Sequence, residues 1–580
     1  MNRQIFVYLK RKGLTDVKLV NRLIVSAYIL HHHLHPKQNA LLYNHVITKQ
    51  SVEYDLLQAF QIQLQKNGCE YSLEDLTELF EFVISPSDRK ISGAIYTPKA
   101  IRERIVAELT CDIDKVQLQN KRFADISCGC GGFFLTIANF IHQQTSKSFA
   151  DIYRENIFGV DIQDYAIERT KILLSLQALI NGEDANFDFN LYVANSLSFD
   201  FTAITPIDIV VGNPPYVCAR NMTDVNRQLL KNWSVCDSGN SDLYIPFFQI
   251  ATEIIQKGGK VGFITMNSFL TSMNGRALRE YFSNQLLDIK IVDFRGCQMF
   301  RGKSTYTCLF FLAKTQSDSV SYCLNPTTIF PNKFEYEQYP YSNFNNREGW
   351  MFRLSTPSVE PSNGKTLREY CKTSHGIATL KNKVYIFKPI YEDKDYYLLE
   401  KDDRQFYIEK EICRDIINSN KFNSDVKIDN IIEKAIYPYR LNNKGQAVIL
   451  QEDELSKSFP LAYEYLLSQK DLLSTRDKGK TNHYPAWYAY GRTQSLIMPR
   501  YKLFFSKIAN RRLRCVVSDD PLLLLYNGFS FVDDDLKKIL ELKRVLESES
   551  FWNFVTSNAK PYSSGFYSIT GQNILSYVMP

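Results

Sequence analysis

Apolar residues follow three successive patterns along this chain. Up to about residue 90 they recur at helical spacing, as at Leu56, Phe60 and Leu64, which predicts helices. From about 91 to 315 short apolar runs alternate with helical stretches, and this alternation is typical of a doubly wound, mostly parallel α/β sheet. After about 320 the alternation gives way to irregular sequence, for which we expect a mixed α+β region. The predicted strands are Phe123–Ser127, Ile157–Asp161, Leu191–Ala194, Ile207–Val211, Lys260–Met266, Ile289–Phe294 and Thr307–Ala313.

These patterns predict three parts in the 580-residue chain: a helical region over 1–90, a domain over 91–320 and a further region over 321–580. A chain of this length has room for roughly three or four domains. In an open α/β sheet, ligands bind where the parallel strands end. The ends of the strands in the central part are therefore the places to look for chemistry.

The first three predicted strands end in residues suited to a nucleotide-like ligand. The first runs into a glycine-rich turn, Ser127-Cys128-Gly129-Cys130-Gly131-Gly132; glycines let a ligand approach the backbone, and the following helix N-terminus favours electronegative groups. The second ends at Asp161, where a carboxylate can accept from both ribose hydroxyls, although a helix N-cap is the alternative. The third ends at Asn195-Ser196, where a polar side chain can hydrogen-bond an adenine amine.

The fourth predicted strand ends in Asn213-Pro214-Pro215-Tyr216. This tetrapeptide offers a side-chain amide, a backbone carbonyl fixed by proline and an aromatic face. The combination suits a planar ring with an exocyclic amine, because the two oxygens can accept its hydrogens while the ring stacks. The predicted reaction is therefore methyl transfer to an amino group, with adenine as the expected ring.

The order of these segments resembles that of class I, S-adenosylmethionine-dependent methyltransferases that act on amino groups. Three further segments make the chain similar to gamma-class (TaqI-like) N6-adenine DNA methyltransferases of restriction-modification systems. They are Ser92–Lys99, which contains Tyr96-Thr97-Pro98, Asp242–Phe248 and Met299–Ser304. The resemblance covers roughly residues 91–315.

The resemblance implies S-adenosyl-L-methionine as the cofactor and a flipped-out adenine as the target. It assigns catalysis to Asn213, Pro214 and Tyr216, and stacking on the base to Tyr216 and Phe300. In this chemistry Asn213 Oδ1 and the Pro214 carbonyl accept the two N6 hydrogens, so positioning and hydrogen bonding carry the reaction. The cofactor contacts that it assigns are Tyr96, Thr97, Asp125, Ser127, Gly129, Asp161, Ile162, Asn195, Ser196, Pro215 and Phe247.

Two residues depart from the family pattern. Asp125 lies in the strand end where a glutamate is often found, which exchanges one carboxylate for another. Asn195 stands where aspartate is common. Its amide oxygen still accepts a hydrogen bond, so we expect cofactor binding to be kept.

A basic stretch lies in the C-terminal region. Between Arg476 and Arg514 ten Lys and Arg residues accompany a single acid, Asp477, with tyrosines interleaved. Such side chains read phosphates and base edges, so double-stranded DNA is the predicted partner. Segments Ser374–Tyr385 and Tyr490–Ser495 resemble parts of the specificity region of this class. The candidate DNA contacts are Lys478, Lys480, Arg492, Gln494, Arg500, Lys507, Arg511 and Arg512.

Composition excludes some classes of protein. The twelve cysteines are scattered, without the spacing of a disulfide framework, and Cys128 and Cys130 have no matching pair for zinc. The histidines just before Pro36 have no flanking acid or cysteine, so we interpret them as a solvated helix end. We see neither a bilayer-spanning run nor a signal peptide. We therefore expect a cytoplasmic protein without a metal site or membrane association, as a monomer or dimer.

Three alternatives stay open. The first is an Asn-Pro-Pro-Tyr methyltransferase acting on RNA or on a protein glutamine. The second is the modification subunit of a multi-subunit restriction system, with sequence recognition on a partner. The third is a fused nuclease–methyltransferase or a silent DNA-binding module, although residues 1–90 show no Asp…Glu-x-Lys nuclease pattern. A cognate restriction endonuclease as partner, a phage-defence role and a solitary role are not distinguished by the sequence.

Overall fold

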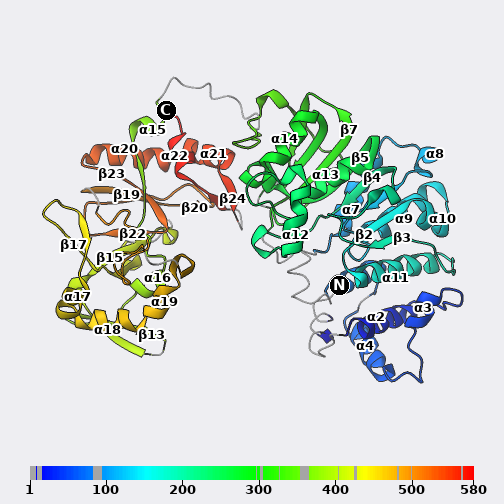
Figure 1. Ribbon diagram of the computed structural model, residues 1–580, viewed down its shortest axis with the longest axis horizontal. Coiled ribbons are helices and arrows are strands. Elements are labelled where there is room, and N and C mark those ends of the chain that lie inside the picture. Colours follow the sequence, from blue (N-terminus) through cyan, green and yellow to red (C-terminus); the bar gives the residue numbers. More distant parts are fainter. Residues whose placement is uncertain are drawn as a thin grey trace. The chain divides into compact units, whose positions relative to one another are not determined.

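The computed structural model describes most of the chain as two compact units, residues 1–352 and 353–580 (Figure 1). The helices upstream of residue 90 share the first unit with the sheet, and the second unit begins past the predicted boundary at 321; the division into three functional domains stays a prediction. The described residues are 5, 8, 9, 16–68, 70–82, 95–295, 297–300, 305–325, 327–352, 365–402, 404–422, 428–479, 483–497, 500–562 and 566–579.

A nine-stranded mixed sheet forms the centre of the first unit, in the order β3-β2-β1-β4-β5-β7-β6-β8-β9. Strands β1 to β5 pair in parallel, and β7 runs antiparallel to both β5 and β6. The predicted mixed α/β fold with a large central sheet is confirmed, and each predicted strand lies in it. The strands are β1 (Phe123–Asp125), β2 (Ile157–Asp161), β3 (Asn190–Val193), β4 (Ile207–Gly212), β5 (Ile255–Met266), β6 (Leu287–Asp293), β7 (Thr307–Gln316), β8 (Ser319–Leu324) and β9 (Glu337–Pro340).

Helices cover both faces of this sheet because successive strand residues point to opposite sides. In β7, Leu309 and Phe311 join the core formed with α7 and α9, whereas the Phe310 ring lies 4.7 Å from that of Phe248 in α13. Each buried side chain of this kind contributes about 1.5–3 kcal/mol to the free energy of unfolding. The helices are α7 (Lys99–Thr110), α8 (Lys115–Leu118), α9 (Gly132–Thr145), α10 (Phe149–Glu155), α11 (Asp164–Ile180), α12 (Asp224–Leu229), α13 (Ile245–Ile254) and α14 (Arg276–Gln285).

The predicted N-terminal helices are present and pack on α11. Ile172, Leu173 and Leu176 of α11 lie in one core with residues of all four helices. The fully buried Arg169 guanidinium donates to Asn21 Oδ1 (2.9 Å) and to the Phe80 carbonyl (2.7 Å). This attachment makes the helices part of the first unit. They are α2 (Val17–His31), α3 (Ala40–His45), α4 (Tyr54–Lys66) and α5 (Leu73–Phe82).

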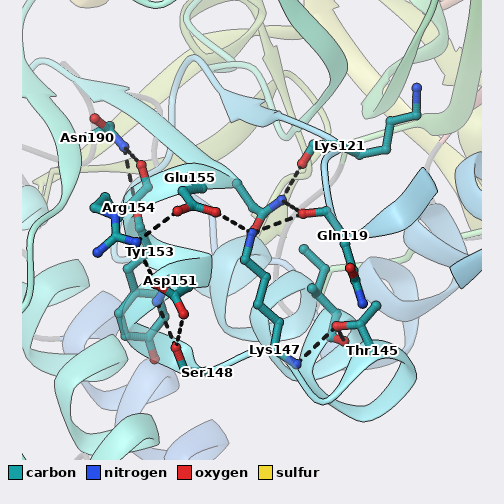
Figure 2. A network of polar contacts seen from close by, with 12 residues as sticks. Gln119, Lys121, Thr145, Lys147, Ser148, Asp151, Tyr153, Arg154, Glu155 and Asn190 are labelled. Atoms are coloured by element: carbon teal, nitrogen blue, oxygen red, sulfur yellow. Dashed lines mark hydrogen bonds and ion pairs between the residues drawn. The ribbon is translucent and has the colours of Figure 1, made fainter. Parts of the chain in front are cut away.

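A polar network fastens the amino-terminal edge of the sheet (Figure 2). Asn156 Nδ2 donates to the carbonyls of Gln119 (2.9 Å) and Lys121 (2.8 Å) just before β1. Asn190 Nδ2, at the start of β3, donates to the Arg154 carbonyl (2.8 Å). These bonds satisfy backbone groups that leave the strand ladders, so this edge of the sheet is held by structural contacts.

The second unit contains small sheets and short helices. Its two four-stranded sheets have the orders β10-β23-β19-β21 and β11-β16-β15-β22. The strands are β10 (Thr373–His375), β11 (Ile386–Phe387), β12 (Tyr391–Glu392), β13 (Tyr396–Lys401), β14 (Arg404–Glu409), β15 (Cys413–Asn418), β16 (Ile432–Ile436), β17 (Tyr439–Leu441), β18 (Ala447–Ile449), β19 (Tyr501–Ser506), β20 (Ile508–Ala509), β21 (Val516–Ser518), β22 (Leu524–Tyr526), β23 (Gly528–Asp533), β24 (Lys560–Tyr562) and β25 (Phe566–Ser568). The helices are α15 (Leu367–Tyr370), α16 (Asn382–Tyr385), α17 (Glu452–Ser458), α18 (Pro460–Ser468), α19 (Lys470–Ser474), α20 (Leu536–Leu546), α21 (Glu549–Asn558) and α22 (Gly571–Leu575). Within the described ranges no helix is both long enough and apolar enough to cross a bilayer.

Candidate active site

A cavity of about 270 Å³ opens at the carboxyl ends of β1, β2 and β4. All eleven residues that the resemblance to the family assigned to the cofactor line it, and so does Asn213. They come from six separate stretches of chain, which the fold brings together at one edge of the sheet. The structure therefore gathers these positions at a single site, while their role as cofactor contacts stays a prediction.

The glycine-rich turn after β1 forms one wall of the cavity. Gly131 has a φ of +81°, and a Cβ there would lie 2.6 Å from Thr170 Cγ2, so only glycine fits. Gly129 N donates to Asp161 Oδ2 at 2.9 Å. The turn is thus locked to the end of β2, and α9 begins at Gly132 directly behind it.

Three carboxyl groups line the cavity, from Asp125, Asp161 and Glu81. Asp125 is only 2% exposed, and burial raises its pKa to about 8. Burial also raises the pKa of Asp161 to about 6, although the amides of Gln163 and Gly129 oppose this shift by hydrogen-bonding the carboxylate. Arg102, the basic residue among the described residues of the lining, is paired with Glu74. Any of these acids that loses its proton is left with a buried negative charge, so the cavity favours a positively charged ligand.

Apolar side chains complete the walls near the end of β3. Ile162 is 50% exposed and Val225 67% exposed, although both line the cavity. Between them Asn195 donates from Nδ2 to Asn226 Oδ1 (3.0 Å) and accepts from Leu197 N (3.0 Å). Phe247 of α13 and the buried Ser196 lie on the same lining. Flat apolar surfaces beside an amide suit a heteroaromatic ring.

Asn213 lies just past β4 with its amide held on one side only. Its Nδ2 donates to the Ile95 carbonyl (3.0 Å) and to Thr97 Oγ1 (3.1 Å). Its Oδ1 is buried and has no hydrogen-bond partner among the described residues. A buried acceptor left unsatisfied costs about 1–3 kcal/mol. An incoming N–H donor would remove this cost, so the atom marks the place for a substrate amine.

The two predicted stacking residues lie together, although neither is among the described residues that line the cavity. The rings of Tyr216 and Phe300 are 6.3 Å apart at an interplanar angle of 64°. Tyr216 Oη donates to the Ile264 carbonyl at 3.1 Å, which fixes its ring, and Phe300 is only 3% exposed. Pro214 is buried between Asn213 and Pro215. In this arrangement the rings contact each other edge to face. Residues 301–304 of the predicted Met299–Ser304 motif lie outside the described residues.

Only some residues of the basic stretch in the second unit are exposed, and others are buried in its core. Tyr488 and Tyr490 are each 1% exposed and Arg476 is 2% exposed, so the interpretation of these tyrosines as part of a DNA face is wrong. They are core residues, and Tyr490 Oη donates to the Ile436 carbonyl (2.6 Å). The tyrosines were misread because alternation with basic residues suggests exposure.

Some predicted DNA contacts are occupied by bonds inside the unit. Arg492 pairs with Asp477 (3.0 Å) and Gln494 Nε2 donates to the Gly376 carbonyl (3.0 Å), although both residues are exposed. Lys507 lies half-buried over the Phe529 ring. Arg500, Arg511 and Arg512 are exposed, and Arg512 pairs with Glu549 (2.9 Å). Lys480 and the side chain of Lys478 lie outside the described residues. DNA contact by this stretch stays a prediction.

Sequence reasoning missed the contribution of α5 and α7 to the cavity. Thr77 and Glu81 of α5 and Arg102 of α7 line it, and Glu81 Oε1 accepts from Cys130 N in the glycine turn (3.3 Å). Nothing in the sequence marks Glu81 except its place on an amphipathic helix. The four histidines before Pro36 (His31, His32, His33 and His35) lie at the end of α2, which ends at His31, and His32 Nε2 lies 2.8 Å from the Tyr71 carbonyl. In the described part of the chain no three His, Cys, Asp or Glu residues gather as metal ligands.

The chain is similar to several known proteins. Residues 155–300 match the family described as Eco57I restriction-modification methylase. The type II restriction enzyme and methyltransferase RM.Eco57I of Escherichia coli is 25% identical over 512 residues, which cover 73% of this chain and 49% of that protein. The chain thus spans about half the length of this relative. The type II methyltransferase M.BanIII of Aneurinibacillus aneurinilyticus is 23% identical over 454 residues, covering 69% of this chain and 74% of that protein.

A solved structure shares the fold. The type IIL restriction-modification enzyme MmeI, solved in complex with DNA, matches with a TM-score of 0.60 and 14% identity, covering 99% of this chain and 82% of that chain. The homologues are type II restriction-modification DNA methyltransferases.

Proposed function

We propose that this protein is a site-specific DNA methyltransferase that transfers a methyl group from S-adenosylmethionine to N6 of a flipped-out adenine in double-stranded DNA. It acts in restriction-modification or phage defence. The observation that carries the proposal is the buried, unsatisfied Oδ1 of Asn213 beside a cavity lined by acids. The order of glycine turn, acidic strand end and Asn-Pro-Pro-Tyr on adjoining parallel strands also supports the class I methyltransferase fold, gamma-class arrangement and adenine specificity.

The lining of the cavity fits the cofactor. S-Adenosylmethionine carries a sulfonium and an ammonium group, and Asp125, Asp161 and Glu81 supply the opposite charge. Ser127 Oγ is buried in the lining and has no partner among the described residues, so it has a free hydrogen bond for a ligand. Asp161 would take the ribose hydroxyls, and Ile162 would lie against the adenine ring. When bound, the cofactor supplies a methyl group on a sulfonium, which is a strong electrophile.

The chain activates the amine by holding it. Adenine N6 is a poor nucleophile because its lone pair is delocalised into the ring. Asn213 Oδ1 and the Pro214 carbonyl each accept one N6 hydrogen, which moves the nitrogen towards tetrahedral geometry and exposes its lone pair. Because these acceptors are fixed in advance, they stabilise the positive charge that develops on the nitrogen. The amine loses its proton to solvent as the N–C bond forms, and no strong general base is needed.

Base flipping follows from the depth of the site. An adenine paired inside a duplex cannot reach a buried amide, so it must leave the helix and be held by stacking. Tyr216, with its hydroxyl hydrogen-bonded to the Ile264 carbonyl, provides a fixed face. Phe300 provides the second face once the base has displaced its ring from the edge-to-face contact with Tyr216. The exposed cations Arg500, Arg511 and Arg512 are the remaining candidates for phosphate contacts on the duplex. A cognate restriction endonuclease as partner also belongs to this proposal.

The direct test is methyl transfer from labelled S-adenosylmethionine to unmethylated genomic DNA, tRNA and protein, followed by nucleoside analysis. We expect the label in N6-methyladenine of DNA. Asn213→Ala is expected to lower the transfer rate by at least about a hundredfold, because it removes a transition-state acceptor, and to leave cofactor affinity nearly unchanged. Asn139→Ala, at an exposed position of α9, is the matched control. Label found only in RNA, protein or cytosine would refute the proposal.

A further inference from the structure

The geometry points to a positioning role for the N-terminal helix α5: through Glu74, Arg102 and Tyr96 it fixes the segment Ile95–Thr97, which sets the orientation of the Asn213 amide. This inference rests on the proposed function and deepens it. It names Thr97 and Glu74 as positioning residues for the choice of an amine as substrate. Neither residue is expected to touch the target base.

Two hydrogen bonds fix the side-chain amide of Asn213 in one orientation. Both Nδ2 hydrogens of Asn213 have acceptors, the Ile95 carbonyl at 3.0 Å and Thr97 Oγ1 at 3.1 Å. Rotating the amide by half a turn would place Oδ1 against the Ile95 carbonyl, which cannot donate a hydrogen bond. The amide is therefore locked with Oδ1 towards the substrate. A locked acceptor takes an amine and repels a carbonyl oxygen, so the orientation is itself a specificity device.

Arg102 holds the Ile95–Thr97 segment, which carries these two acceptors. Arg102 Nε donates to the Thr97 carbonyl at 3.0 Å. The same guanidinium donates to the Gly132 carbonyl and to Thr136 Oγ1 (3.0 Å), and its side chain is 1% exposed. Arg102 thus ties the Ile95–Thr97 segment to the start of α9, which lies behind the glycine turn. Arg102 therefore holds both the glycine-turn wall of the cavity and the segment that orients the Asn213 amide.

The N-terminal helices contribute to this hold through Glu74 of α5. Glu74 Oε1 accepts from Arg102 and from Tyr96 Oη. Burial and the Glu74 carboxylate raise the pKa of Tyr96, so its hydroxyl stays protonated and donates. Glu74 therefore holds Tyr96, which is next to Thr97, and Arg102, which donates to the Thr97 carbonyl. The N-terminal helices, which the proposed chemistry does not otherwise use, complete the active site.

Thr97→Val tests the role of the hydroxyl, since valine keeps the shape and removes the acceptor. We expect the single-turnover rate at saturating cofactor and DNA to fall about tenfold, the usual effect of losing one hydrogen bond at the reacting group. Thr97→Ser is expected to restore most of this rate. In an Asn213→Ala background Thr97→Val should have no further effect, because it acts through the amide. An unchanged rate in Thr97→Val, or effects of the two substitutions that multiply, would overturn the inference.

A second measurement does not depend on catalysis. In the full-length protein labelled with ¹⁵N-asparagine, the Asn213 Nδ2 protons are assigned by their loss in Asn213→Ala. We expect them to exchange slowly with solvent, and to exchange at least about tenfold faster in Thr97→Val and Glu74→Ala. Glu70→Ala, an exposed acid just before α5, is the control and should leave exchange unchanged. If the wild-type protein methylates no DNA, the proposed function fails, while equal exchange in all variants would refute the positioning role.

Discussion

Asp125→Asn is predicted to stabilise the cofactor-free protein at neutral pH while weakening cofactor binding. The Asp125 carboxyl is 2% exposed, and burial raises its pKa to about 8. Its Oδ1 accepts from Ser127 N at 3.0 Å, and an asparagine oxygen can keep this bond. The amide has nearly the shape of the protonated acid and stays neutral at every pH, so the substitution removes the cost of taking up a proton on folding without creating a cavity.

The magnitude follows from the difference in proton binding. An aspartate in an unfolded chain has a pKa of about 3.9. Between about pH 4 and pH 8 the folded state therefore binds one more proton than the unfolded state, and the free energy of unfolding falls by about 1.4 kcal/mol per pH unit. From pH 5 to pH 7 the wild type loses about 3 kcal/mol relative to Asp125→Asn. For a unit of 352 residues this widens the difference in melting temperature by roughly 4 °C.

The assay is thermal unfolding of both proteins from pH 5 to pH 8 without cofactor, with cofactor affinity measured at each pH. The difference in melting temperature should grow with pH, while the exposed control Asp188→Asn should show a constant difference. Wild-type affinity for S-adenosylmethionine should fall up to about tenfold per pH unit below 8, because the cation must displace the Asp125 proton. Asp125→Asn should lose this pH dependence. A melting difference that stays constant from pH 5 to pH 8 would refute a buried, protonated carboxyl.

Two further predictions concern the base and the DNA. Tyr216→Phe should lower the free energy of unfolding by about 1 kcal/mol, because it removes the hydrogen bond to Ile264, and keep transfer within a few-fold of wild type. Tyr216→Ala should also lose the stacked 2-aminopurine signal of a flipped base, and equal signals would contradict stacking. Arg511→Ala with Arg512→Ala should reduce the slope of log affinity against log salt by about one for each phosphate that these arginines neutralise, measured by DNA titration at several salt concentrations. An unchanged slope would remove this loop from the DNA surface, and Lys444→Ala, at another exposed position of the unit, is the control.

Much of the central sheet was predictable because a buried strand appears in the sequence as a short, continuous run of apolar residues. The run Ile207–Val211 is apolar enough to mark β4, and a ligand site at its end follows from parallel strand geometry. Boundaries were less certain: β5 begins at Ile255, five residues before the predicted start, because its exposed Gln256-Lys257-Gly258 stretch does not look like a strand.

The contribution of α5 to the cavity was not predictable, for a different reason. Glu81 and Cys130 are 49 residues apart, and their contact depends on how the N-terminal helices pack against α11. An amphipathic helix shows which face is buried but not against what. The buried Arg476 and Lys502 were misjudged in the same way, since each donates to backbone carbonyls inside the fold, a role that no local pattern reveals.

The acids of the cavity have a consequence for turnover. Asp125, Asp161 and Glu81 attract a sulfonium, and the attraction ends when the methyl group departs, because the thioether left behind is uncharged at sulfur. In the proposed reaction, this part of the electrostatic attraction is therefore present for the methyl donor and absent for the spent cofactor. The buried acids would thus favour exchange of the one for the other after each transfer.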